Sequence, residues 1–385
     1  MNLLLVTTVL PHRLSTGGEI ATQNFIAGLV AGGHAVDVIG YLRPNDPAPI
    51  ESHYHSAGFR HIETEAAGAR AYGWLARAML SGNPYIVQKY ISTRLKNEVR
   101  DFLRREKYDA VIIDHAQMGW LLDSIGSTIP KIFIAHNIES RLYLDQSTND
   151  NAHGKAKRLI LRRDAKLIDV MEHRLATSCE QVWTLTVSEA EYFARITASN
   201  KIRVMGLPGR GTNGSVPGRC EARIDVGLLG SWIWEVNRHG LEWFTRYVVP
   251  LIPREITISV AGRGADLVEG IPERVQRVGF VEDPLDFLAS CRVVVIPTTT
   301  GAGIQLKTID AISVGRSIVS TSLGLRGIED LPSYVQIADS PQAMAVSIID
   351  AVKMNEARRA DQGLDWLRRR EIAFIGDVGM ALSSI

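Results

Sequence analysis

The chain has 385 residues, which is too long for one ordinary hydrophobic core, so its length predicts two domains. Its hydrophobic fraction of 45% and charged fraction of 22% are those of a globular protein, not of a disordered chain or a membrane-embedded one. A formal net charge of +1 offers no general electrostatic attraction to nucleic acid, which we therefore exclude as a partner.

The cysteines and the N-terminal segment indicate the compartment. The three cysteines are far apart and odd in number, so they fit neither a disulfide framework nor a zinc site and favour a reducing environment. The apolar stretch Met1 to Leu10 is shorter than the roughly 20 residues that cross a bilayer. It also lacks the basic start and the cleavage site of a signal peptide. We therefore expect a buried first strand there and a cytoplasmic protein.

In the first half, short β-rich runs alternate with helical patterns. The first run is followed by Gly17-Gly18, a helix pattern from Ile20 to Ala31, and Gly32-Gly33, which is a C-cap signal. Several runs are continuously apolar, as strands covered by helices on both faces are. Strands separated by helices predict a parallel, doubly wound sheet. The strands expected in this half are Leu3–Thr7, Ala35–Ile39, Ala110–Ile113, Lys131–Ala135 and Val182–Val187.

A candidate site in this half combines two glycines with two strand ends. Gly17 and Gly18 stand at a helix entrance, where backbone N–H groups and the helix dipole favour an anion; a plain loop is the alternative. Two runs end in ionisable residues, at Asp114-His115 and at His136–Glu139. Strand ends of an open α/β sheet line the ligand crevice, and histidine can exchange a proton near neutral pH. An ordinary surface or capping role for the histidines stays open.

A stretch dense in glycine and proline divides the chain. Residues 206–218 read GLPGRGTNGSVPG, which is typical of a linker. We expect an N-terminal Rossmann-like domain at residues 1–205, a linker at 206–222, a C-terminal Rossmann-like domain at 223–360 and a helical segment at 361–385. Packing of that last segment on the first domain stays open. The two doubly wound parallel sheets are expected to face each other across a ligand cleft.

The segment Arg292 to Thr321 is the most informative part of the chain. It reads as a strand, the small-residue turn Thr298–Gly303, a helix beginning near Ile304 and closed by Gly315, and a second strand. In a parallel sheet such a turn lies at the ligand-binding edge. Its glycines let a ligand approach the backbone, and the following helix N-terminus attracts an anion. The strands expected in this half are Val226–Leu229, Glu255–Val260, Val275–Val278, Val293–Ile296, Ser317–Ser320 and Tyr334–Ile337.

Lys307 and Asp310 lie on one side of this helix, because residues three apart are neighbours. An ammonium group for phosphate and a carboxylate for sugar hydroxyls suit a nucleotide or a nucleotide-sugar. The alternative is a glycine-tolerant turn followed by solvated charges. The chain has no Asp-x-Asp after an apolar strand, no HExxH and no GxxxxGK[ST] loop, so we predict no metal site and no P-loop. Lysine, arginine and helix ends must then neutralise the phosphate charge.

These motifs resemble those of the retaining glycosyltransferases with a GT-B fold, the "group 1" superfamily, from Leu3 to about residue 352. The specific matches lie in the second half, in the branch whose donor loop reads GaGiklKvlEA. The matching segments there are Gly227–Asn237 with Gly240–Phe244, Val260–Gly264, Val278–Asp283 and Gly301–Ala311 (GAGIQLKTIDA). The looser matches in the first half are Gly17-Gly18, His136–Glu139 and Val187–Glu189.

The resemblance implies a transferase, typically a hexosyltransferase, that moves a sugar from a nucleoside-diphosphate donor to an acceptor hydroxyl. Together with the missing metal motifs, it predicts metal-independent chemistry without a cofactor. It places His136 against the transferred sugar, Lys307 on the donor diphosphate and Asp310 on the ribose. The residues implied to bind the donor are Gly17, Gly18, Gly230, Ser231, Asn237, Arg263, Phe280, Val281, Gly301, Ala302, Gly303 and Ile304.

Three departures from the family pattern bear on donor recognition. Asp310 stands where the family usually has glutamate and is one methylene shorter. Ser231-Trp-Ile-Trp replaces a common Arg/Lys pair, and Gly206-Leu-Pro-Gly-Arg replaces the usual PNGV at the domain junction. Recognition of the sugar is therefore less well specified than binding of the diphosphate.

The acceptor is indicated only by composition. Residues 70–105 mix aromatic, aliphatic and basic side chains at helical spacing. Such helices could rest peripherally on the inner face of the membrane, where a lipid-linked saccharide would be the acceptor in polysaccharide or glycoconjugate assembly. Helices packed on their own sheet are the alternative. A nucleotide-sugar epimerase of the same fold and a non-catalytic nucleotide-sugar-binding protein also stay open, and no oligomeric state is indicated.

Overall fold

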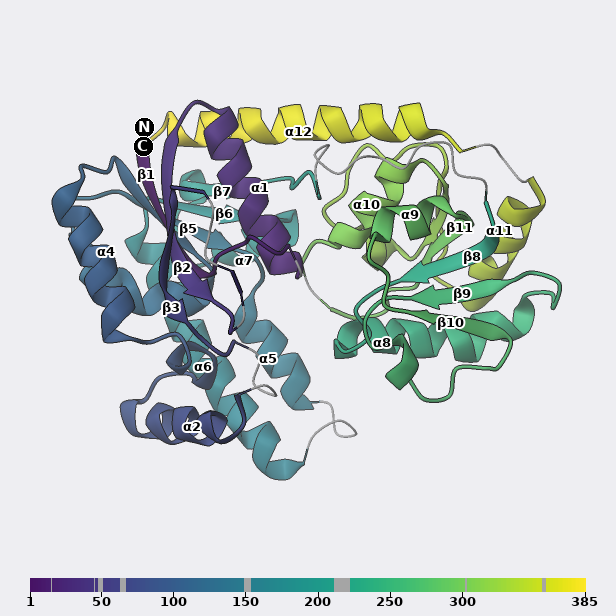
Figure 1. Cartoon of the computed structure of the whole chain (residues 1–385), viewed down its shortest axis with the longest axis horizontal. Helices are drawn as coiled ribbons and strands as arrows, with labels where there is room; N and C mark the ends of the chain where they lie inside the picture. Colours follow the sequence, from purple (N-terminus) through teal and green to yellow (C-terminus); the bar gives the residue numbers. More distant parts are fainter. Residues whose placement is uncertain are drawn as a thin grey trace. The chain divides into compact units, whose positions relative to one another are not determined.

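The chain forms two compact units, one made of Met1–Met205 with Phe374–Ile385 and the other of Gly206–Ala373 (Figure 1). The computed structural model describes residues 1–14, 16–44, 46–47, 51–62, 67–148, 154–210, 222–301, 303–354 and 358–385. The last helix, α12 (Ala360–Leu382), starts among residues of the second unit and ends among those of the first. Among the helices of these ranges, none has both the length and the apolar character needed to cross a bilayer.

The first unit contains a seven-stranded sheet of order β3-β2-β1-β4-β5-β6-β7, and its neighbouring strands are parallel. Its strands are β1 (Asn2–Val9), β2 (Ala35–Leu42), β3 (Tyr54–Phe59), β4 (Ala110–Asp114), β5 (Lys131–Ala135), β6 (Gln181–Thr184) and β7 (Ile202–Val204). Its helices are α1 (Gly17–Ala31), α2 (Ala69–Ser81), α3 (Tyr85–Gln88), α4 (Thr93–Arg105), η2 (Ala116–Ser124), α5 (Glu139–Thr148), α6 (Lys155–Ser178), α7 (Val187–Phe193) and η3 (Ser199–Lys201). The order reverses between β1 and β4, so a ligand crevice is expected at their carboxyl ends.

Strand β1 shows why this sheet is covered on both faces. Leu4 and Val6 belong to the core cluster that includes Leu95 and Val99 of α4. The intervening Leu3 and Leu5 are also completely buried. Because alternate residues of a strand point to opposite faces, helices must cover both sides of the sheet, as the continuous apolar run predicts.

In the first half, the structure shortens one predicted strand and adds two strands that were not predicted. Strand β6 ends at Thr184, so the predicted extension to Val187 is wrong. Thr186 and Glu189 form a reciprocal capping box that starts α7 at Val187, and this local helix signal overrides the β-branched run. Strands β3 and β7 were not predicted, because both are edge strands whose polar and half-exposed residues do not form an apolar run.

The second unit contains a six-stranded parallel sheet of order β10-β9-β8-β11-β12-β13. Its strands are β8 (Ile224–Leu229), β9 (Ile258–Ala261), β10 (Val275–Gly279), β11 (Cys291–Ile296), β12 (Ser317–Ser320) and β13 (Val335–Ile337). Its helices before α12 are α8 (Glu235–Trp243), η4 (Phe244–Val248), η5 (Val249–Leu251), η6 (Ala265–Leu267), α9 (Pro284–Ala289), α10 (Leu306–Val314), η7 (Ser322–Leu325) and α11 (Pro341–Met354). All six predicted strands of this half are present. β9 starts three residues later than predicted, at Ile258.

Helices also cover both faces of this second sheet. Val293 and Val295 of β11 pack in one core cluster with Phe244 of η4 and Ile348 of α11. Val294 and Ile296 point to the opposite face and are equally buried. The strand order reverses between β8 and β11, so the loops after these strands lie at the edge where ligands of such sheets bind.

Candidate functional site

The glycine-rich turn after β11 adopts backbone conformations that favour glycine. Gly301 and Gly303 have φ values of +107° and +75°, in the left-handed region that other residues avoid. A Cβ on Gly301 would lie 2.6 Å from Cγ1 of Val236, so the start of α8 packs closely on this turn. Ala302, which was predicted to bind the donor, lies outside the described residues.

Helix α10 begins at Leu306, two residues after the predicted start at Ile304. Gln305 at its N-cap makes no side-chain hydrogen bond to the helix. The first backbone N–H groups are therefore not capped by that side chain, and the positive end of the helix dipole lies beside the glycine turn. Ile304 belongs to the turn, next to Gly303, and is half-buried.

Lys307, Asn237 and Ser231, which were all predicted to border the donor, are brought together by hydrogen bonds. Nζ of Lys307 donates to Oδ1 of Asn237 at 2.9 Å. Nδ2 of Asn237 donates to the carbonyl oxygen of Ser231, also at 2.9 Å. Burial lowers the pKa of Lys307 to about 8. The Asn237 side-chain amide thus orients the Lys307 ammonium group. Because this partner is neutral, the positive charge stays available to an anion.

Asp310 is buried and paired with a cation that we did not predict from the sequence. Its Oδ2 accepts a hydrogen bond from Nε of Arg210 at 3.1 Å. Burial raises the pKa of Asp310 to about 6, while Arg210 acts in the opposite direction. The backbone at Gly209, which has a φ of +80°, lies close to α10. A Cβ on this glycine would be 2.6 Å from Cγ2 of Ile309. The junction segment therefore folds directly onto α10.

The other predicted donor residues of this unit follow neighbouring strands. The amide of Gly230 donates to the carbonyl of Ala261 at 3.2 Å, and that of Trp232 donates to the carbonyl of Arg263 at 2.8 Å. The amide of Gly262 donates to Gly279, next to Phe280 and Val281. The Arg263 and Phe280 side chains are exposed and that of Val281 is half-buried. These backbone hydrogen bonds link the segments at the carboxyl ends of β8, β9 and β10 along one edge of the sheet.

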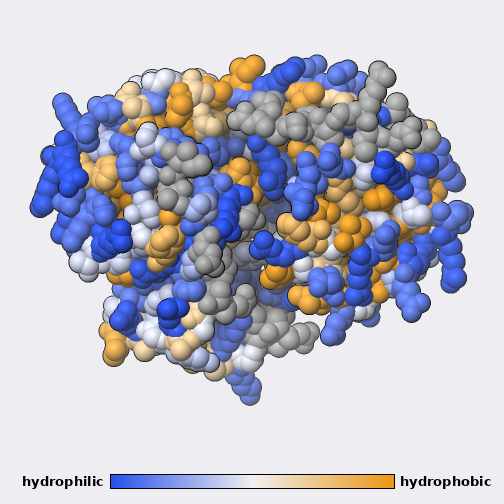
Figure 2. All heavy atoms as spheres, in the orientation of Figure 1, coloured by the Kyte–Doolittle hydropathy of each residue, from blue (hydrophilic) through white to orange (hydrophobic). Residues whose placement is uncertain are grey.

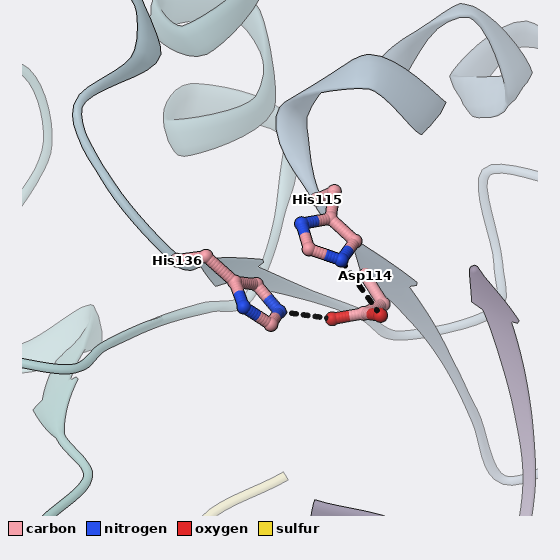
Figure 3. A group of neighbouring side chains, drawn as sticks. All are labelled: Asp114, His115 and His136. Carbon is pink, nitrogen blue, oxygen red and sulfur yellow. Dashed lines mark hydrogen bonds and ion pairs between the residues drawn. The ribbon is translucent and has the colours of Figure 1, made fainter. Parts of the chain in front are cut away.

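In the first unit, a buried carboxylate gathers side chains from four elements. Oδ2 of Asp114, at the end of β4, accepts hydrogen bonds from the hydroxyls of Thr7 in β1 and Thr22 in α1, both at 2.7 Å. Oδ1 accepts from Nε2 of His136, which follows β5, at 2.6 Å (Figure 3). The two strand ends lie side by side, because β4 pairs with β5. Thr7 and Thr22 were missed, since each lies inside an otherwise unremarkable element.

His115 completes this cluster. Its ring stacks on that of His136 with centroids 3.7 Å apart, and its Nε2 lies 3.5 Å from Oδ2 of Asp114 (Figure 3). Its φ is +73°, a conformation that costs about 1–3 kcal/mol for a residue other than glycine. A Cβ on Gly18 would lie 3.5 Å from the His115 ring. The start of α1 therefore adjoins His115 at Gly18.

The charges of this cluster follow from burial and hydrogen bonding. Burial would raise the pKa of Asp114, but the adjacent imidazoles and the hydrogen bonds from His136 and Thr7 outweigh it and hold the pKa well below its usual range. Burial lowers the pKa of His115 to about 4, so its ring is neutral at neutral pH. An ionised carboxylate thus fixes the His136 ring, which is the arrangement used to orient a histidine that contacts a substrate.

The same three residues have the chemistry of metal ligands. One ligand atom each from Asp114, His115 and His136 lies within 4.8 Å of the others. Two imidazoles and a carboxylate are a common set for transition metals. Both Asp114 oxygens already accept hydrogen bonds from protein donors, so the geometry fits an orienting carboxylate better than a metal ligand.

A second buried carboxylate supports the segment that carries His136. Glu172 is completely buried, and its two oxygens accept hydrogen bonds from the backbone amides of Glu139, at 2.7 Å, and Ser140, at 3.3 Å. It therefore caps the start of α5. Burial raises the pKa of Glu172 to about 7, and the nearby Glu139 adds to the shift.

A pH-dependent contribution to stability follows for Glu172. Its pKa is higher in the folded chain, so folding favours the protonated form, and its contribution falls as pH rises from 4.5 to about 7. For Glu172→Gln, which keeps one acceptor and cannot ionise, we expect the melting temperature relative to the parent to rise across that interval. Thermal unfolding across that interval checks this. A constant difference between the two proteins would contradict it.

The comparisons with known proteins agree with this architecture. Residues 16–208 match the family model "Glycosyl transferase 4-like domain", and residues 223–354 match "Glycosyl transferases group 1". None of the curated proteins matches the chain. Together the two family models cover most of the chain.

Similar solved structures share the fold over the whole chain. Sucrose-phosphate synthase from Thermosynechococcus elongatus is 15% identical, with a TM-score of 0.64 over 100% of this chain and 98% of that one. HepE from Anabaena, in complex with UDP and glucose, is 14% identical, with a TM-score of 0.62 over 100% of both chains. The lipopolysaccharide outer core galactosyltransferase WaaB is 12% identical, with a TM-score of 0.60 over 100% and 99%. The two parallel sheets, the matched family models and these structures make the chain a member of the group 1 glycosyltransferases with the GT-B fold.

Proposed function

We propose that the protein transfers a sugar, with retention of the anomeric configuration, from a nucleoside-diphosphate donor to an acceptor hydroxyl. The diphosphate binds at the Gly301–Gly303 turn and the N-terminus of α10, beside Lys307. The observation that carries this proposal is the set of hydrogen bonds from Lys307 through Asn237 to Ser231. These residues are distant in sequence, yet they converge on the start of α10, which the Gln305 side chain does not cap. HepE, a structure of the same fold, binds UDP and UDP-glucose.

The chemistry follows from where charge develops. The bond between the anomeric carbon and the diphosphate oxygen breaks, and its electron pair stays on the diphosphate. The acceptor oxygen bonds to the same face of that carbon, which retains the configuration, and its proton passes to the departing diphosphate oxygen. Lys307 and the α10 N–H groups stabilise the departing diphosphate, and they do so more strongly in the transition state than in the ground state. In this proposal they take the place of a metal ion. His136, held by Asp114, contacts the sugar, and Asp310 accepts a hydrogen bond from the ribose.

For the acceptor we propose a lipid-linked saccharide, in the assembly of a cell-surface polysaccharide or glycoconjugate. WaaB, which has the same fold, is a lipopolysaccharide outer core galactosyltransferase. The basic and apolar helices of residues 70–105 fit an acceptor that is presented at a membrane.

Binding and product analysis test the function together. In a thermal-shift screen of UDP, GDP, ADP and dTDP with their sugars, one nucleotide is expected to raise the melting temperature, because a ligand of the native state stabilises it. The matching sugar donor should then give free nucleoside diphosphate and a glycosylated product only when a saccharide acceptor is added. Conversion of the donor without acceptor would indicate an epimerase. Binding without sugar release across an acceptor panel would indicate a binding protein.

The proposed roles of Lys307 and Asp310 predict a bell-shaped pH profile. Lys307 must be protonated and Asp310 ionised, so kcat/KM for the donor should fall below about pH 6 and above about pH 8. In Arg210→Ala the acidic limb should move to higher pH, because the cation that favours the Asp310 carboxylate is gone. The alkaline limb should stay, and Arg210→Lys should shift less. Steady-state rates of the parent, Arg210→Ala and Arg210→Lys across this pH range test the prediction. An acidic limb at the same pH in all three proteins would contradict the assignment of that limb to Asp310.

A further inference from the structure

Helix α2 presents an uncharged row of side chains to solvent. Its Trp74 and Ala78 are buried, whereas Tyr72, Ala76 and Leu80 lie one turn apart on the outward side. Tyr72 is 78% exposed and Leu80 is 89% exposed. The outward side of a helix on a globular protein is ordinarily polar or charged. This row is therefore unusual for a surface that faces only water.

Basic side chains flank this row. Arg70 and Arg77 lie two turns apart at the edge of the outward side of α2, which contains no acidic residue. The first half of α6 adds Lys155, Leu159, Arg162 and Lys166, all exposed and in one stripe. Leu159 is 71% exposed.

Helices α2 and α6 are joined directly. Nη2 of Arg163 in α6 donates to the backbone carbonyl of Ala78 in α2 at 2.8 Å. Nη1 of the same arginine pairs with the buried Asp164 at 2.8 Å, which holds the guanidinium in place. Leu159 precedes Arg163 by one turn, so the stripe of α6 continues beside the end of α2. We call the exposed row and cations of the two helices the α2–α6 surface.

The charge of this surface differs from that of the chain as a whole. Two arginines of α2 and three cations of the α6 stripe give five positive charges, whereas the whole chain has a formal net charge of +1. In Figure 1, α2 lies at the lower left of the first unit, and Figure 2 shows apolar and pale spheres beside blue ones there. We propose that the α2–α6 surface docks on an anionic lipid bilayer.

The combination of apolar and basic groups selects this partner. An interfacial helix places its apolar side at the boundary of headgroups and acyl chains, while flanking Lys and Arg contact anionic headgroups. The 13 residues of α2 would lie along about 20 Å of the membrane plane. A second copy of the chain, paired through the same surface, would bring like charges together. Nucleic acid would use the cations but leave the apolar row in water.

The α2–α6 surface contains none of the residues assigned to the donor. The proposal rests on the membrane-presented acceptor of the proposed function and names the surface that meets the bilayer, and its test does not depend on sugar transfer. It is tested by sedimentation of the full chain with phosphatidylcholine vesicles that do or do not contain phosphatidylserine, in the absence of donor and acceptor. We expect binding only to the anionic vesicles and less binding at high salt. Tyr72→Ser with Leu80→Ser should weaken binding about tenfold or more. Arg162→Gln with Lys166→Gln should weaken it about fivefold per charge.

Matched variants on other helices serve as controls. Met380→Ser removes a side chain of α12 that is 67% exposed, and Lys353→Gln with Arg368→Gln removes two exposed cations of α11 and α12. Both should bind like the parent protein. Absence of binding to anionic vesicles would overturn the proposal, and so would equal losses in test and control variants. A parent protein that is dimeric in solution and becomes monomeric in the Tyr72/Leu80 variant would assign the surface to self-association instead.

Discussion

Lys307→Ala is expected to lower kcat by roughly two to three orders of magnitude, the effect of losing a donor aimed at charge that develops in the transition state. The loss should fall on kcat more than on KM if the ammonium acts mainly on the departing diphosphate. Asn237→Ala should have a smaller effect in the same direction, because it removes only the amide that orients the Lys307 side chain. Steady-state kinetics with saturating acceptor measure both.

The control for this prediction is Lys353→Ala, which removes an exposed lysine from the end of α11 in the same unit. It should leave kcat unchanged. A Lys307→Ala protein with the parent's kcat and an unchanged melting temperature would refute the role of Lys307 in leaving-group stabilisation.

Asp114→Ala is expected to reduce the free energy of unfolding of the first unit by about 3–5 kcal/mol, the cost of removing one member of a buried, charge-assisted network. Asp114 is completely buried, and its loss leaves the donors of Thr7, Thr22 and His136 without their acceptor. Hydrogen exchange of the amides in β1, β4 and β5 reports this unit separately from the other. Because His136 would also lose its fixed orientation, sugar transfer should fall in the fraction that remains folded.

Thr22→Val is the matched variant, because it removes one of the three donors and keeps the carboxylate. The expected cost is about 1–3 kcal/mol. The depressed pKa of Asp114 adds a pH dependence, since its contribution is present above the usual pKa of an aspartate and is lost as pH falls below that value. Exchange rates that are equal in the parent and in Asp114→Ala would show that the network does not hold these strands together.

Much of the fold could be predicted because its signals are local. Strand β11 is a continuous apolar run, and α10 is closed by Gly315 in the left-handed conformation, as predicted. The segment after Thr184 shows how such a reading fails, because a capping box outweighs β-branched side chains there. The edge strand β3 has no apolar run, since its residues are only partly buried.

The sites could be predicted only as separate pieces. A glycine turn with a lysine one turn into a helix indicates a phosphate site wherever it occurs, and resemblance supplies the remaining positions. The bond from Lys307 to Asn237 joins residues 70 positions apart, and that from Arg210 to Asp310 joins residues 100 positions apart. No periodicity or spacing contains such pairs. The proximity of Asp114 and His136 is a long-range contact that a sequence can indicate, because neighbouring strands of a parallel sheet end at the same edge.

The most direct measurement is a crystal structure of the chain with the nucleoside diphosphate that raises its melting temperature most. Phosphate oxygens are expected within hydrogen-bonding distance of Lys307 Nζ and of the backbone N–H groups at the start of α10, with the ribose beside Asp310. A nucleotide bound elsewhere, with Lys307 still hydrogen-bonded only to Asn237, would contradict this expectation.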